Sequence, residues 1–69
     1  MRRLKITQKV GKKIRITRKN KNLTQEELAS KVKMHVSTLG RIERGESNAP
    51  LQTINRIAQS LGVNPKIFL

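Results

Sequence analysis

Hydrophobic residues recur along most of this chain at intervals of three and four positions, the spacing typical of amphipathic α-helices. Two such stripes follow each other in the middle of the chain: Leu28, Ala29 and Val32, then Val36, Leu39 and Ile42. A break at Lys33 and Met34 separates them. No stretch shows the strict alternation of a β-strand, so the pattern predicts an all-α fold.

The ends of these two helices are marked by polar residues and glycine. Thr24 can accept the backbone N–H of Glu27, while the Glu27 side chain reaches back to the Thr24 N–H, which is the reciprocal capping box. Gly45 stands just past the second stripe, where a left-handed residue closes the last turn. Two short helices joined by a tight turn are therefore predicted, an arrangement whose second helix can enter the DNA major groove.

Further helices are predicted on both sides of this pair. The first runs from a Thr7 cap to about Asn20 and turns Val10, Ile14 and Thr17 inward. A polar turn follows it, and Leu23 is placed to staple the entry of the next helix. The division expected from this pattern is a basic arm at 1–6 followed by one domain at 7–69.

A loop over 46–50 leads into a fourth helix, with Pro50 in its first turn and Gly62 closing it. Its predicted buried face consists of Leu51, Ile54, Ile57, Ala58 and Leu61. Asn64 and Pro65 then open a last short helix over 66–69.

The chain has 69 residues and no cysteine, so neither a large core nor disulfide bonds can supply stability. It carries 16 Lys and Arg against 4 Asp and Glu, for a formal net charge of +12. Ten of these cations lie within residues 1–21, which contain no acid. Such an imbalance predicts a polyanionic partner, most often nucleic acid, although any single lysine can simply be a solvated surface residue.

Other classes of function find little support in the composition. With one histidine and four acids, the chain offers no pairing of nucleophile and base, no metal-binding cluster and no evident cofactor or small-molecule site. Phe68 is the only aromatic residue, which disfavours RNA binding by base stacking. No apolar run is long enough for a bilayer span or an export signal. A cytoplasmic, nucleoid-associated protein with no membrane partner is expected.

From Val10 onward the chain resembles the lambda-repressor-like, XRE-type helix-turn-helix family. The stretches that carry the resemblance are VGKKIRITRKNKNLTQEELA, STLGRIERGE and LQTINRIAQSLGV. The resemblance implies a compact five-helix bundle in which residues 25–44 form the helix-turn-helix motif. It also implies double-stranded DNA binding, usually as a homodimer, in the control of transcription.

The family pattern assigns Val36, Ser37 and Arg41 to base edges, and Gly40 is grouped with them. Helical spacing places Ser37 and Arg41 opposite Leu39. The guanidinium fork of Arg41 matches guanine O6 and N7, and Val36 can rest on a thymine methyl group. Contacts to the DNA backbone are expected from a second set of polar and basic residues: Gln25, Lys33, His35, Arg44, Asn48 and, in the arm, Arg2, Arg3 and Lys5.

Two positions instead resemble a structural ion pair of phage repressors, Arg18 and Glu43, which would link the first helix to the reading helix. The chain also departs from the family pattern. Lys33 replaces the usual turn glycine, so either it adopts a left-handed conformation or the turn differs in shape. His35 replaces the usual Ser or Thr cap, and Gly40 interrupts the reading helix, where it either reflects drift or allows close approach to the groove.

The apolar end of the chain motivates the prediction of a homodimer. Its contact residues would be Val63, Ile67, Phe68 and Leu69, although Phe68 can instead be a core residue. The operator of such a dimer would be near-palindromic. The resulting hypothesis is a repressor or controller protein, not an enzyme. The alternative is an antitoxin or adaptor that mainly binds a protein partner, with DNA binding serving autoregulation.

Overall fold

Helical elements account for most of the chain in the computed structural model, which describes residues 2–69 and the side chains from Ile6 onward. In order they are α1 (Arg2–Asn20), α2 (Gln25–Lys31), α3 (Val36–Glu43), α4 (Leu51–Leu61) and the 3₁₀ helix η1 (Pro65–Phe68). The prediction of an all-α fold is confirmed, but the described residues contain four α-helices and not five. The last element has only four residues and so closes as a 3₁₀ helix.

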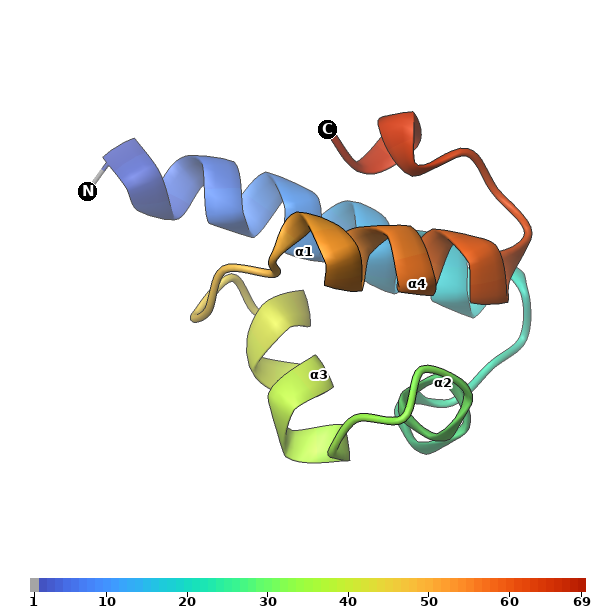
Figure 1. The fold of residues 1–69 in the computed structure, drawn as a ribbon. Coiled ribbons are helices and arrows are strands. Elements are labelled where there is room, and N and C mark those ends of the chain that lie inside the picture. Colours follow the sequence, from blue (N-terminus) through green and yellow to red (C-terminus); the bar gives the residue numbers. More distant parts are fainter. Residues whose placement is uncertain (1) are drawn as a thin grey trace.

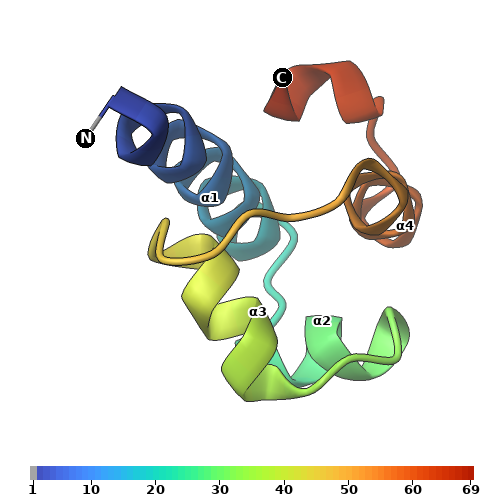
Figure 2. The same ribbon diagram turned by 60° about the vertical axis from the view of Figure 1, so that its left-hand side comes forward.

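The helices form two groups that Figures 1 and 2 show from different sides. α1, α4 and η1 make up one half of the molecule, and α2 and α3 make up the other. α1 packs against both α3 and η1, while α2 packs against α3 and α4. Each of the two short helices therefore packs against a longer one, α3 against α1 and α2 against α4.

The core lies where all five elements meet. Each element contributes one of the largest fully buried side chains: Ile14, Leu28, Leu39, Ile57 and Phe68. Most of the predicted inward face of α4 is buried, but Leu51 is 62% exposed, so its assignment to the core was wrong. Leu51 is the first residue of α4, and the buried side chains of this helix begin one turn later, at Ile54.

The first helix starts earlier than predicted. α1 begins at Arg2, so Thr7 lies inside the helix and does not cap it. The arginines, leucine and lysine over residues 2–5 are good helix formers, and no glycine or proline interrupts them, which explains the extension. Met1 lies outside the described residues. Pro50 also differs from the prediction, because it caps α4 from the preceding position and is not in its first turn.

Each of the four α-helices is followed within two positions by a residue in the left-handed conformation. These residues are Asn22, Lys33, Gly45 and Gly62, with φ between 57° and 77°. In each case the next N–H donates back to the carbonyl five residues earlier, as Glu46 does to Arg41 at 2.9 Å. The turn between α2 and α3 thus keeps its tight shape, and Lys33 adopts the left-handed conformation in place of the usual glycine, at a cost of about 1 kcal/mol.

Candidate nucleic-acid interface

The exposed face of α3 is the candidate reading surface. Leu39 and Ile42 anchor the helix in the core, and helical spacing leaves Ser37 and Arg41 on the opposite, exposed side. Val36, at the start of the helix, is 40% exposed. The three residues predicted to read base edges are therefore all accessible on one short helix.

Two other positions of α3 lie beside these residues in the sequence, one exposed and one buried. Thr38 is also exposed and was not predicted as a contact, although it is a polar residue on the outer side of the apolar stripe. Gly40 is buried, and a Cβ built on it would lie 3.0 Å from Arg44 Nη1 and 3.8 Å from Gln25 Oε1. Gly40 thus faces the side chains of two predicted backbone contacts, and its own role at the DNA stays a prediction.

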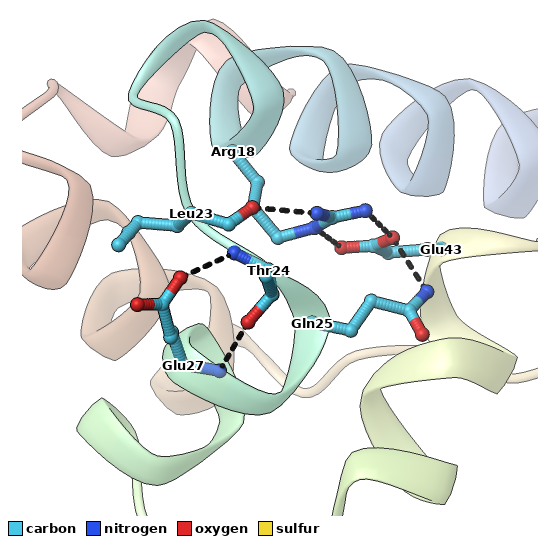
Figure 3. Close-up of polar contacts among 6 residues, drawn as sticks. All are labelled: Arg18, Leu23, Thr24, Gln25, Glu27 and Glu43. Atoms are coloured by element: carbon cyan, nitrogen blue, oxygen red, sulfur yellow. Dashed lines mark hydrogen bonds and ion pairs between the residues drawn. The ribbon is translucent and has the colours of Figure 1, made fainter.

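A buried polar network fixes α3 relative to α1 and α2 (Figure 3). Arg18 donates from Nε to Glu43 Oε2 at 2.7 Å and from Nη2 to Glu43 Oε1 at 2.9 Å, so the expected ion pair is present and bidentate. Arg18 Nη1 also donates to the Leu23 carbonyl at 2.7 Å, and Gln25 Nε2 donates to Glu43 Oε1 at 2.9 Å. Every buried polar side-chain atom in the described part of the chain has a partner.

The network has an electrostatic consequence for Arg18. Hydrogen bonds from the guanidinium to Glu43 raise the pKa of Arg18 above its ordinary value, against the opposing effect of burial. Arg18 therefore keeps its charge in the core, where it forms the ion pair with Glu43.

The start of α2 is held as the sequence predicted. Thr24 Oγ1 accepts the Glu27 N–H at 3.0 Å, and Glu27 Oε1 accepts the Thr24 N–H at 2.8 Å, so the capping box is confirmed. The hydrogen bond from the Thr24 backbone lowers the pKa of Glu27 below its ordinary value. This cap fixes Gln25 as the first residue of α2, next to Glu43.

α1 and α3 come into close contact at Gly11. A Cβ on Gly11 would lie 2.1 Å from the Ile42 carbonyl oxygen and 2.8 Å from that of Glu43, so only glycine allows the two helices to come this close. Gly45 lies against Gln8 in the same way, with 2.5 Å from its hypothetical Cβ to Gln8 Cγ. Gly11 was not predicted as a contact position, because a glycine inside a helix gives no signal of what lies against it.

The predicted backbone contacts surround the two ends of α3. His35 caps its start in an extended conformation but makes no side-chain capping hydrogen bond, and it is exposed, as is Lys33. Arg44 is exposed at the other end, and Asn48 follows in the loop, where its Oδ1 accepts the Thr7 hydroxyl at 2.7 Å. Gln25 is half-buried. The side chains of Arg2, Arg3 and Lys5 lie outside the described residues, so their contacts stay predictions. The backbone of residues 2–6 is part of α1 and continues the first helix.

Two arginines have partners that sequence reasoning missed. Arg44 donates from Nε to Glu46 Oε2 at 2.9 Å and from Nη2 to Glu46 Oε1 at 3.3 Å. Arg56, on α4, donates from Nη2 to the Val32 carbonyl and so closes the end of α2. Neither contact has a sequence signal beyond the residue types themselves.

Positive charge continues along α1. Its exposed cations with described side chains are Lys9, Lys12, Lys13, Arg15 and Lys19. The salt bridges of the described side chains are Arg18–Glu43 and Arg44–Glu46, and neither uses these residues. No helix over residues 2–69 is both long enough and apolar enough to cross a bilayer.

Comparison with known proteins assigns the chain to a family. Residues 14–68 match the model of the helix-turn-helix family HTH_3. The chain belongs to this family. The XRE-type resemblance noted in the sequence is thereby confirmed.

Individual relatives agree with the family assignment. The chain is 42% identical over 60 residues to the control protein C.BamHI of Bacillus amyloliquefaciens, covering 86% of this chain and 74% of that protein. It is 41% identical over 54 residues to the immunity repressor protein of Bacillus phage phi105, covering 78% of this chain but only 38% of the repressor. Among solved structures, the restriction-modification controller protein C.AhdI from Aeromonas hydrophila superposes with a TM-score of 0.88 at 33% identity, covering 91% and 96% of the two chains.

These findings decide the class of function. This helix-turn-helix protein is a DNA-binding transcription regulator and not an enzyme. The antitoxin or adaptor alternative is not favoured by them.

Proposed function

We propose that this helix-turn-helix protein is a homodimeric controller that reads a near-palindromic operator through α3. The observation that carries the proposal is the exposed face of α3, presented by a helix whose position is fixed by the buried Arg18–Glu43 pair. The similarity to C.BamHI and C.AhdI supports a role in controlling a gene set, such as restriction-modification genes. Such a regulator would reside with the nucleoid in the cytoplasm.

Base reading in this proposal belongs to three residues. Arg41, exposed on the outward face, donates two N–H groups of its guanidinium to guanine O6 and N7. Ser37 pairs with either a donor or an acceptor, and Val36 contacts a thymine methyl group. Thr38 lies at the margin of the same face, where it reaches a flanking base or phosphate.

Phosphate contacts set the register of the helix without reading sequence. Lys33 and His35 supply them at the N-terminal end of α3, Arg44 and Asn48 supply them at its C-terminal end, and Gln25 supplies one from the start of α2. The basic residues Arg2, Arg3 and Lys5 add contacts from the N-terminal segment. These contacts are predictions from the family pattern and from the exposure of the described side chains.

Dimerisation in this proposal uses the C-terminal segment. Ile67 is 44% exposed and Leu69 is 70% exposed, and Val63 is half-buried beside the core. Phe68 was predicted to be either a core residue or a dimer contact; it is the last residue of η1 and fully buried, so it is a core residue. Two copies joined here would present their α3 helices to half-sites about one helical turn apart.

The dimer is tested by replacing its apolar residues. Ile67→Glu with Leu69→Glu should give a folded monomer in sedimentation that binds the operator weakly, because both positions are exposed in the single chain. Lys66→Glu, an exposed neighbour of the same segment, is the control for added negative charge and should remain a dimer. A wild-type protein that sediments as a monomer both free and on DNA would exclude this assembly.

The DNA target itself is found by selection of bound duplexes from a random pool. The expected product is one site with two related halves about one turn apart. Recovery of unrelated sequences would exclude sequence-specific reading.

A further inference from the structure

A carboxylate lies at the C-terminal end of the reading helix, among its cations. Glu46 is fixed there by the backbone, since its N–H donates to the Arg41 carbonyl at 2.9 Å and the preceding residue, Gly45, is packed against Gln8 of α1. The end of α3 therefore presents Glu46 beside Arg44, a predicted phosphate contact.

Glu46 occupies the edge of Arg44 that a phosphate would use. The contacts are Nε to Oε2 at 2.9 Å and Nη2 to Oε1 at 3.3 Å, so one side of the guanidinium fork is filled by the two carboxylate oxygens. The remaining nitrogen, Nη1, lies over Gly40, 3.0 Å from where its Cβ would be. Arginine binds phosphate bidentately through this kind of paired N–H edge, so a phosphate that binds at this edge must displace Glu46.

The Arg44–Glu46 pair is exposed to solvent, so burial does not hold it together. The side chains of Arg44 and Glu46 are 58% and 56% exposed, so an incoming phosphate can displace the carboxylate. The hydrogen bonds from Arg44 lower the pKa of Glu46, and the positive charge of Arg41 lowers it further. Glu46 is thus an anion that stands close to two cations of the proposed DNA contact.

We propose that Glu46 acts as a built-in competitor for phosphate at Arg44, so that DNA must displace it and every duplex is bound more weakly than the cations alone would allow. The proposal rests on the proposed DNA-binding function and assigns a regulatory residue to the same site. Because the competition concerns the DNA backbone, it lowers the affinity for operator and random sequence by the same factor. In a chain of charge +12, it limits the electrostatic part of binding to every duplex.

Salt dependence gives the competition a signature. Salt weakens the contact between Arg44 and a phosphate, but it also weakens the contact between Arg44 and Glu46. The two effects partly cancel, so Arg44 contributes less than the usual slope of about 0.9 per phosphate contact. Removing the charge of Glu46 by substitution should restore the full contribution of Arg44 to the salt slope.

The experiment measures the affinity of wild type, Glu46→Gln, Arg44→Gln and the double variant for two duplexes of equal length. One duplex is the site recovered from the random pool and the other has a scrambled sequence, and both are titrated between low and moderate salt. Glu26→Gln, which removes an exposed charge on α2, is the matched control. Glu46→Gln should bind both duplexes about two- to five-fold more tightly and with a steeper salt slope.

The Arg44→Gln background separates competition from simple loss of charge. There, Glu46→Gln should gain no more than Glu26→Gln gains in wild type. Equal or weaker binding by Glu46→Gln, or the same gain with and without Arg44, would overturn the role of Glu46 while leaving the DNA-binding function in place. A wild-type protein that binds neither duplex would overturn both.

Discussion

Replacing Glu43 by glutamine tests how the buried ion pair supports the reading helix. The substitution keeps the shape of the side chain but removes its charge, and one carboxylate oxygen becomes an amide NH₂ that faces the guanidinium. Arg18 then keeps its bond to the Leu23 carbonyl and loses one of its two bonds to the residue at position 43. A buried cation is left without a counter-charge.

The size of the effect follows from that uncompensated charge. Removing one partner of a buried pair costs about 3 to 5 kcal/mol. A folded chain of 69 residues has a total stability of about 3 to 10 kcal/mol, so Glu43→Gln should be close to unfolding at 25 °C. Replacing both partners by apolar residues, with Arg18→Met and Glu43→Leu, should recover most of the loss because neither buried charge remains.

Urea unfolding followed by circular dichroism gives the required free energies. Glu46→Gln is the matched control, because it makes the same change in the exposed pair with Arg44 and should leave the unfolding midpoint unchanged. A loss below about 1 kcal/mol for Glu43→Gln, or a double apolar variant as unstable as the single one, would refute the reasoning.

Three further predictions concern helix packing and capping. Gly11→Ala should destabilise the fold by about 1 to 3 kcal/mol, because its Cβ would meet the Ile42 carbonyl oxygen at 2.1 Å. Gly40→Ala should instead raise the free energy of unfolding by up to about 1 kcal/mol, because its Cβ would be in tight contact only with the flexible tip of Arg44. Equal losses of stability in Gly11→Ala and Gly40→Ala, measured by urea unfolding, would contradict this contrast. The pKa of Glu27 lies below its ordinary value of 4.5, so its stabilising effect is present above pH 4.5 and lost as the pH falls through the lower folded-state pKa. The stability difference between wild type and Glu27→Gln should therefore shrink in acid, and a difference independent of pH would exclude this role of the cap.

The features that could be predicted from the sequence are those set by local chemistry. The capping box at Thr24 and the left-handed glycine at Gly45 depend on a few adjacent residues, and both are present. The Arg18–Glu43 pair came from the family resemblance, because its members are 25 positions apart and no local rule connects them. Its geometry nevertheless agrees with the expectation.

Features that depend on packing between elements could not be predicted in this way. Periodicity indicates which face of a helix is buried, but it does not show where neighbouring elements end, so Leu51 was wrongly placed in the core. The sequence left two conformations open for Lys33, and the hydrogen bonds of the turn decided between them. The close approach at Gly11 and the pairing of Arg44 with Glu46 require the arrangement of the chain in space.

The claim that the exposed face of α3 reads base pairs is tested most directly at Arg41. The measurement is the affinity of wild type and Arg41→Ala for the selected operator and for a scrambled duplex at the same salt concentration. Arg41→Ala should lose about 5- to 150-fold on the operator and far less on the scrambled duplex, with relaxed preference at one base position. Equal losses on the two duplexes would show that Arg41 contributes charge alone and would contradict base reading by this helix.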